Sequence, residues 1–108
     1  MEKSEVYQIE LKKLNEIFAD VDASKAKLVE GLIQDAAFLK AENHVLREHI
    51  SKTGMVKIHP LNPDLQKPIE TGKQYLKNIN SYAVVIKTLN GVLSKNVLDP
   101  DDELDEFE

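Results

Sequence analysis

The chain has 108 residues, of which 42% are hydrophobic and 31% are charged, and it contains no Cys. That length fits one domain with a modest core, and chains of this size often complete their burial by oligomerising. The lack of Cys excludes disulfides and thiolate chemistry, and no apolar run approaches the roughly 18 residues needed to span a membrane. The charged stretch Met1–Glu5 has no apolar segment behind it, so we expect no signal peptide and a cytoplasmic location.

Charge is segregated along the sequence. Residues 1–48 hold ten acids and seven bases, residues 49–98 hold seven Lys against two acids, and residues 99–108 hold seven acids and no base. The net charge of −5 therefore conceals a basic second half and an acidic end. A basic surface of this kind favours a polyanionic partner such as nucleic acid.

The first predicted helix covers about residues 4–19. Its apolar residues recur at steps of three and four and so share one face: Tyr7, Leu11, Leu14, Phe18 and Val21. The opposite, solvent-facing side is expected to hold Glu10, Lys12, Lys13 and Glu16. The segment 20–24 breaks the pattern and supplies several residues that can cap the next helix.

The second predicted helix runs from about residue 23 to residue 51. A seven-residue period is sustained for three heptads: Val29, Leu32, Ala36, Leu39, Asn43, Leu46 and Ile50. Such a seam is typical of a long helix that packs against another helix, as in a coiled coil. Gly54 stands where a C-terminal cap belongs.

A linker is predicted at 52–62, followed by a third long helix at about 63–95. Pro60 and Pro63 exclude a continuous helix through the linker, and the alternation around Val56 allows a short extended piece. Asn62 suits an N-cap with Pro63 in the first turn, although Pro68 then kinks the helix or marks its true start. Apolar stripes along this helix predict that much of it is buried, either within the monomer or between subunits. Five of these residues are candidates for an interface between subunits: Leu76, Ile79, Tyr82, Ile86 and Leu89.

The sequence thus predicts an all-α fold: one helical domain over 1–98 and a disordered acidic tail over 99–108. The tail has too little apolar content to offset the conformational entropy that it would lose on becoming ordered. Its two large apolar groups, Leu104 and Phe107, are candidate anchors for docking a basic partner. The alternatives are a solubilising end, or a segment that shields the basic half of its own chain.

Nothing in the sequence predicts catalysis, a cofactor or a metal. His44 and His49 are five residues apart, which places them roughly 140° apart around a helix and unlike a metal-binding pair. We expect these two histidines and His59 to face solvent or a partner. The four Gly are scattered singly, so no phosphate-binding loop is present. We therefore expect a protein that is not an enzyme.

Lysines supply the candidate nucleic-acid contacts. Lys73, Lys77 and Lys87 share a broad flank of the third predicted helix, while three further lysines lie before it: Lys52, Lys57 and Lys67. The alternative is a solvated face that keeps the helix soluble. Because Arg47 is the only Arg, base-specific readout is poorly supported, and we expect weak, salt-sensitive binding that depends on several subunits.

Between Gln34 and Leu93, several short sequence segments follow one another in an order that resembles the sequence pattern of a known protein family. Those segments are Gln34-Asp35-Ala36-Ala37-Phe38-Leu39, Leu46-Arg47-Glu48-His49-Ile50, Gly54, a Pro-bounded linker, Gln74-Tyr75-Leu76-Lys77, Ser81-Tyr82 and Ile86-Lys87-Thr88-Leu89. They are similar to the phage terminase small subunits found in phages and prophages of Gram-positive bacteria.

The resemblance implies a role at the start of genome packaging. A small subunit of this kind binds double-stranded phage DNA, forms a homo-oligomer and regulates the terminase large subunit, an ATPase. One departure is that the sequence has no convincing helix-turn-helix, because the helix after Asp20 lacks a basic recognition face. The alternatives are a helical homo-oligomeric adaptor that never touches nucleic acid and, less favoured, a regulator that binds a ligand between its helices.

Overall fold

The computed structural model describes residues 1–97. These residues form three helices and one two-stranded hairpin: α1 (Lys3–Ile17), α2 (Ala23–Thr53), β1 (Val56–Ile58), β2 (Gln66–Pro68) and α3 (Glu70–Val97). The predicted all-α class with three helices is confirmed. The acidic segment 99–108, with Leu104 and Phe107, lies outside the described residues.

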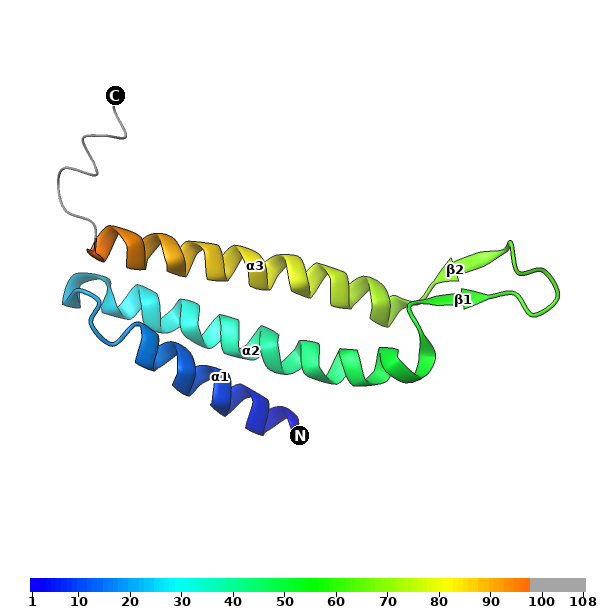
Figure 1. Ribbon diagram of the computed structural model, residues 1–108, viewed down its shortest axis with the longest axis horizontal. Coiled ribbons are helices and arrows are strands. Elements are labelled where there is room, and N and C mark those ends of the chain that lie inside the picture. The colour runs from blue at the N-terminus through cyan, green and yellow to red at the C-terminus, as the bar shows by residue number, and fades with distance from the viewer. Residues whose placement is uncertain (98–108) are drawn as a thin grey trace, which may run out of the picture.

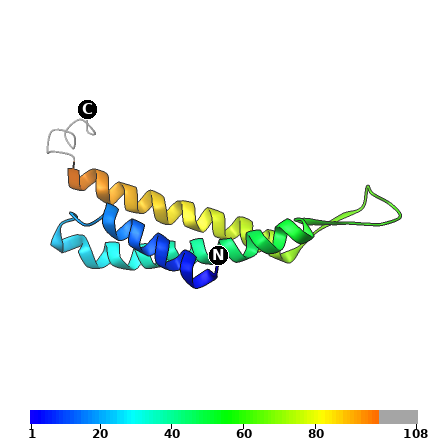
Figure 2. The same cartoon turned by 60° about the horizontal axis from the view of Figure 1, so that its bottom comes forward.

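The helices form a long, flat body. α2 and α3 run antiparallel and side by side, while α1 lies against the first part of α2 and runs antiparallel to it (Figures 1 and 2). The principal extents are 64 × 38 × 15 Å. The shortest extent is less than half of the second one, so the body is elongated and flat.

The core lies where the three helices meet. Its buried apolar members come from all three helices: Leu14, Phe18, Val29, Ile33, Ala36 and Leu89. Leu14, Phe18 and Val29 stand on the apolar faces predicted for the first two helices, which are confirmed at these positions. Leu89 is 0% exposed and is the largest side chain so completely enclosed. The core is small, as the charge-rich composition predicts.

α2 ends at the predicted glycine cap. The Gly54 N–H donates to the Ile50 carbonyl oxygen at 2.7 Å, and the Gly54 φ angle is +77°. A residue with a side chain would be strained at that angle. The helix reaches Thr53, slightly past the predicted end at about 51, and the Thr53 hydroxyl donates to the His49 carbonyl oxygen at 3.2 Å.

Of the two predicted starts of the third helix, the one at Pro63 is wrong, because α3 begins at Glu70, two residues after the alternative start at Pro68. Residues 56–68 instead form an antiparallel hairpin, with Pro63 in its loop and Pro68 at the last position of β2. A proline lacks the N–H that a helix or strand interior needs, so prolines are tolerated in the loop and at the strand end. The predicted linker 52–62 is thus divided among the end of α2, β1 and the loop.

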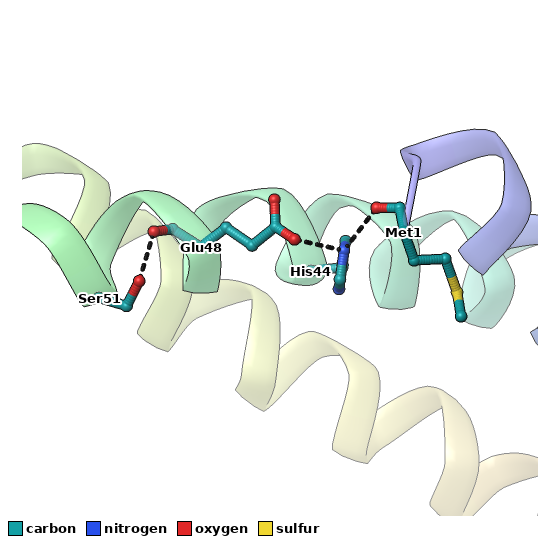
Figure 3. Close-up of polar contacts among 4 residues, drawn as sticks. All are labelled: Met1, His44, Glu48 and Ser51. Carbon is teal, nitrogen blue, oxygen red and sulfur yellow. Dashed lines mark hydrogen bonds and ion pairs between the residues drawn. The ribbon is translucent and has the colours of Figure 1, made fainter.

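The N-terminal residue is fixed to the middle of α2. His44 Nε2 lies 2.9 Å from the Met1 carbonyl oxygen and 3.0 Å from Glu48 Oε1, so one N–H is shared between two acceptors (Figure 3). The Ser51 hydroxyl donates to the Glu48 carbonyl oxygen at 2.6 Å. His44 was expected to face solvent or a partner, whereas here it makes an internal contact that docks the start of the chain.

Candidate nucleic-acid interface

The β1–β2 hairpin projects beyond the helical body, at the end where α2 finishes and α3 begins (Figures 1 and 2). Every residue from 51 to 68 is exposed. In the antiparallel register Lys57 is directly opposite Lys67. Residues paired in this way place their side chains on the same face of the ribbon. Two positive charges therefore stand together on an exposed projection, residues 55–69, which we call the lysine arm.

His59 adds a third polar group to this face, because it follows Lys57 by two residues and strand side chains alternate. Its Nδ1 accepts the backbone N–H groups of Leu61 and Asn62, each at 3.1 Å. With Nδ1 occupied as an acceptor, the neutral ring carries its proton on Nε2. The Nε2–H is then a donor for a ligand on the lysine face. Sequence reasoning had left His59 without a role.

A hollow of about 380 Å³ opens on the lysine arm, with six lining residues: Lys57, His59, Pro60, Leu65, Gln66 and Lys67. Across the part of the chain that the structure describes, neither lysine of the arm has an acidic partner. Like charges directly opposite each other destabilise a hairpin. A bound anion would remove that repulsion, so the arm is suited to a negatively charged ligand.

Three of the six predicted nucleic-acid contacts lie at the root of the arm. Lys52 lies in the last turn of α2, and Lys73 and Lys77 lie in the first turns of α3. Lys73 is partly neutralised by Glu70, whose Oε1 is 3.3 Å from its Nζ. Lys87 lies about 15 Å further along the axis of α3, at 1.5 Å per residue, so it is not part of this group.

Packing at the root fixes the arm to the helices. The Ile69 N–H donates to the Met55 carbonyl oxygen at 3.0 Å, which closes the hairpin at its base. Gly72 is buried beside Met55, and a Cβ at Gly72 would lie 3.1 Å from that same oxygen. Arg47 donates to the Tyr75 hydroxyl at 3.1 Å, with its guanidinium 5.9 Å from the ring centroid. The arm therefore has a defined orientation.

The five predicted interface residues do not share one environment. Leu76 is 52% exposed and Ile79 is 38% exposed, so both are available to a second copy. Tyr82 and Ile86 are partly buried against the core of their own chain. Leu89 is 0% exposed and is therefore buried within the monomer, the alternative to an interface between subunits that the apolar stripes left open. Its stripe faces α1 and α2, which sequence periodicity alone does not reveal.

A buried polar cluster joins the helices, and the sequence reasoning missed it. Glu10 was expected to face solvent, but it is 3% exposed. The Tyr82 hydroxyl donates to Glu10 Oε2 at 2.6 Å, and Lys13 Nζ lies 2.7 Å from Glu10 Oε1. Lys40 Nζ stands 5.5 Å from the centroid of the Tyr82 ring. The carboxylate is therefore fully engaged in joining α1 to α3.

The two titratable groups of this cluster are shifted in opposite senses. Burial raises the pKa of Tyr82, and the Glu10 carboxylate that accepts its hydrogen bond raises it further. Burial also acts to raise the pKa of Glu10, but hydrogen bonds from Lys13 and Tyr82 and the charges of Lys13 and Lys40 outweigh it. The net result is a Glu10 pKa below its usual value. Glu10 is thus held ionised as a structural group.

Comparison with protein-family models, with curated proteins and with solved structures finds no match. None of the helices between residues 1 and 97 is both long and apolar enough to cross a membrane. Among the same residues no group of three or more acidic or His side chains is placed to hold a metal ion.

Proposed function

We propose that this chain is a DNA-binding subunit of the phage terminase small-subunit type, acting in the host cytosol at the start of genome packaging. The observation that carries the proposal is the lysine arm, where Lys57 and Lys67 stand opposite each other without acidic partners. Double-stranded DNA carries one negative charge per about 1.7 Å of axis, and a two-stranded ribbon fits its grooves. In this role the chain is not itself an enzyme.

In this proposal Lys57, Lys67 and His59 contact phosphates from the arm. Lys52, Lys73 and Lys77 extend the positive surface at the root of the arm. These contacts position the protein but read no base sequence, because single ammonium groups on phosphates carry no sequence information. Binding by one subunit is accordingly weak.

Self-association raises the affinity by presenting several arms to one duplex. The flat body exposes Leu76 and Ile79 on α3, and burying them against a second copy removes apolar surface from water. Linked sites bind more tightly than separate ones, because every contact after the first is intramolecular. A homo-oligomer is therefore part of the proposed function.

The terminase large subunit is the second proposed protein partner. The acidic segment 99–108 provides seven negative charges for docking, with Leu104 and Phe107 as apolar anchors. Deleting the segment after Leu98 is expected to abolish that contact while DNA binding is retained. The check is a pull-down with the large subunit, alongside a DNA-binding titration of the same truncated protein.

The test of the proposed function is the salt dependence of DNA binding, measured by fluorescence anisotropy with a labelled duplex. The logarithm of the binding constant is expected to fall linearly with the logarithm of salt concentration. Replacing Lys57 and Lys67 together by Gln is expected to make the slope shallower by about 2 for each bound arm.

A matched control removes two exposed lysines elsewhere, Lys12 and Lys27, with the same change in net charge. This control is expected to keep the slope of the wild-type protein. The proposal fails if the wild-type oligomer binds no duplex at low salt. It also fails if the control weakens binding as much as the arm variant does.

A specific observation supports a second candidate, a helical homo-oligomeric adaptor that does not bind nucleic acid. Large apolar side chains are exposed on the helices away from the arm, with Leu28 at 61%, Phe38 at 56% and Val84 at 63%. Exposed apolar groups of this size are suited to protein contacts. An oligomer that binds no duplex at low salt would favour this adaptor.

A further inference from the structure

The tip of the lysine arm carries one highly exposed apolar side chain. Leu61 is 89% exposed, the highest value among the large hydrophobic residues that the structure describes. It follows Pro60 and precedes Asn62 and Pro63 in the loop between β1 and β2. An isolated exposed Leu is ordinary on a protein surface. This one differs because it stands at the end of a projecting, positively charged ribbon.

Hydrogen bonds within the loop hold the tip in one shape. The backbone N–H groups of Leu61 and Asn62 both donate to His59 Nδ1 at 3.1 Å. The Leu65 N–H donates to the Asn62 carbonyl oxygen at 3.0 Å, and the Asp64 N–H donates to Asn62 Oδ1 at 3.2 Å. Together with the fixed φ angles of the two loop prolines, these contacts leave little conformational freedom to lose on binding.

Proteins that bend DNA commonly combine two elements: basic side chains that hold the phosphates and an apolar wedge that enters between base pairs. The arm places both on one rigid ribbon, with Lys57 and Lys67 near its base and Leu61 at its end. We propose that Leu61 wedges between two base pairs of the duplex that the lysines hold, and so bends the DNA. This inference rests on the proposed function, in which the arm binds duplex DNA.

The charge of the arm favours DNA over a protein pocket as the ligand of the tip. A protein pocket that accepted Leu61 would also have to place acids beside Lys57 and Lys67, whereas a duplex supplies phosphates on both sides of every base step. Unstacking a base step costs free energy, and the phosphate contacts offset that cost. Steps that unstack easily should therefore be preferred.

The test compares two duplexes of identical sequence, one intact and one with a single central nick. The nick reduces the cost of unstacking without changing the phosphate contacts except at one position. The wild-type protein is expected to bind the nicked duplex about tenfold more tightly. Fluorescence energy transfer between dyes at the two ends of the intact duplex is expected to rise on binding, because bending brings the ends together.

Leu61→Ala is the decisive variant, and its high exposure means that the fold does not depend on the side chain. It is expected to bind both duplexes equally and to leave the energy transfer unchanged, while the salt slope stays that of the wild type. The matched control is Ile9→Ala, which removes a side chain that is 55% exposed on α1, away from the arm. The control is expected to keep the nick preference and the bend.

The outcomes separate this inference from the proposed function. Salt-dependent binding without nick preference or bending, or a Leu61→Ala variant that retains both, overturns the wedge and leaves the DNA-binding role standing. Loss of self-association in Leu61→Ala, with DNA bending unchanged, also overturns it and assigns the tip to a protein contact. Absence of any duplex binding by the wild-type oligomer overturns both proposals.

Discussion

A hydrogen bond between two side chains joins α1 to α3. The Tyr82 hydroxyl donates to the Glu10 carboxylate at 2.6 Å, in a partly buried position. A hydrogen bond to a charged group contributes about 1.5–3 kcal/mol. Tyr82→Phe is expected to lower the free energy of unfolding by about that amount, measured by urea denaturation. As a control, Tyr7→Phe removes a hydroxyl with no hydrogen-bond partner within residues 1–97 and should change stability little.

The lowered pKa of Glu10 makes stability depend on pH in a defined direction. Glu10 binds its proton less readily in the folded chain than in the unfolded chain. Its contribution is therefore present above the unfolded pKa and is lost as pH falls through the lower folded value. Unfolding free energies of the wild type and Glu10→Gln, measured between pH 6 and pH 3, should converge as the pH falls. A constant difference across that range would contradict this assignment.

The burial of Glu10 was partly predictable from the spacing of residues in the sequence. Glu10 and Leu14 are four residues apart and therefore share a helix face, although Glu10 was assigned to solvent by its charge. The part that could not be predicted is the partner. Tyr82 lies on another helix, 72 residues away in the chain, and only the packed structure brings its hydroxyl to the carboxylate.

In the β1–β2 hairpin, the two lysines that are proposed to bind DNA also lower the stability of the hairpin. Lys57 and Lys67 face each other on the hairpin and repel. Lys67→Glu turns this pair into one of opposite charge and is expected to stabilise the hairpin by about 0.2–1 kcal/mol. Hydrogen exchange at the hairpin amides should slow, while the affinity for duplex DNA falls. Tighter DNA binding by this variant would contradict the role of the arm.

Two glycines in α3 offer a second comparison. A Cβ at Gly91 meets nothing within 4 Å, so Gly91→Ala is expected to raise the unfolding free energy by about 0.5–1 kcal/mol through helix propensity. A Cβ at Gly72 lies 3.1 Å from the Met55 carbonyl oxygen, at the root of the arm. Gly72→Ala should therefore bring no such gain and should loosen the hairpin. Urea midpoints and amide exchange of the two variants provide the check.

The helices could be predicted from the sequence, whereas only the first strand of the hairpin could be. Long helices repeat an apolar pattern over many turns, which is why the faces of α1 and α2 could be placed before the structure was known. The strands have three residues each, too few to establish a period. The alternation at Val56 and Ile58 indicated a short extended segment. Asn62 followed by Pro63 is also a typical helix start, so the residues of the second strand were assigned to the third helix.

At the scale of the molecule, the described residues leave large apolar side chains exposed on the helices. Ile79 is 38% exposed on α3, and Ile79→Asp is expected to dissociate the oligomer while helicity is retained. Asn80→Asp adds the same charge at the neighbouring exposed position and should leave the assembly intact. Light scattering and circular dichroism at tens of micromolar protein give both readouts. A wild-type monomer at that concentration would contradict the proposed self-association.

The Leu89→Ala variant tests whether the Leu89 side chain stabilises the fold of the single chain rather than a contact between copies. Because Leu89 is 0% exposed, its truncation should lower the free energy of unfolding by about 2–5 kcal/mol. The loss should not depend on protein concentration. Sequence periodicity gave Leu89 and Ile79 similar weight as interface residues, since both recur at helical spacing. The packing of α3 against α1 and α2 distinguishes the enclosed residue from the exposed one.

In the proposed function, the lysine arm is the part of this protein that contacts DNA. Hydrogen exchange of the full-length protein, with and without a short duplex at low salt, locates the contact. Slowed exchange is expected across residues 55–69 and in the first turns of α3, with α1 unchanged. Protection confined to α1 or to the face around Phe38, with the arm exchanging as fast as in the free protein, would contradict the proposed role of the arm.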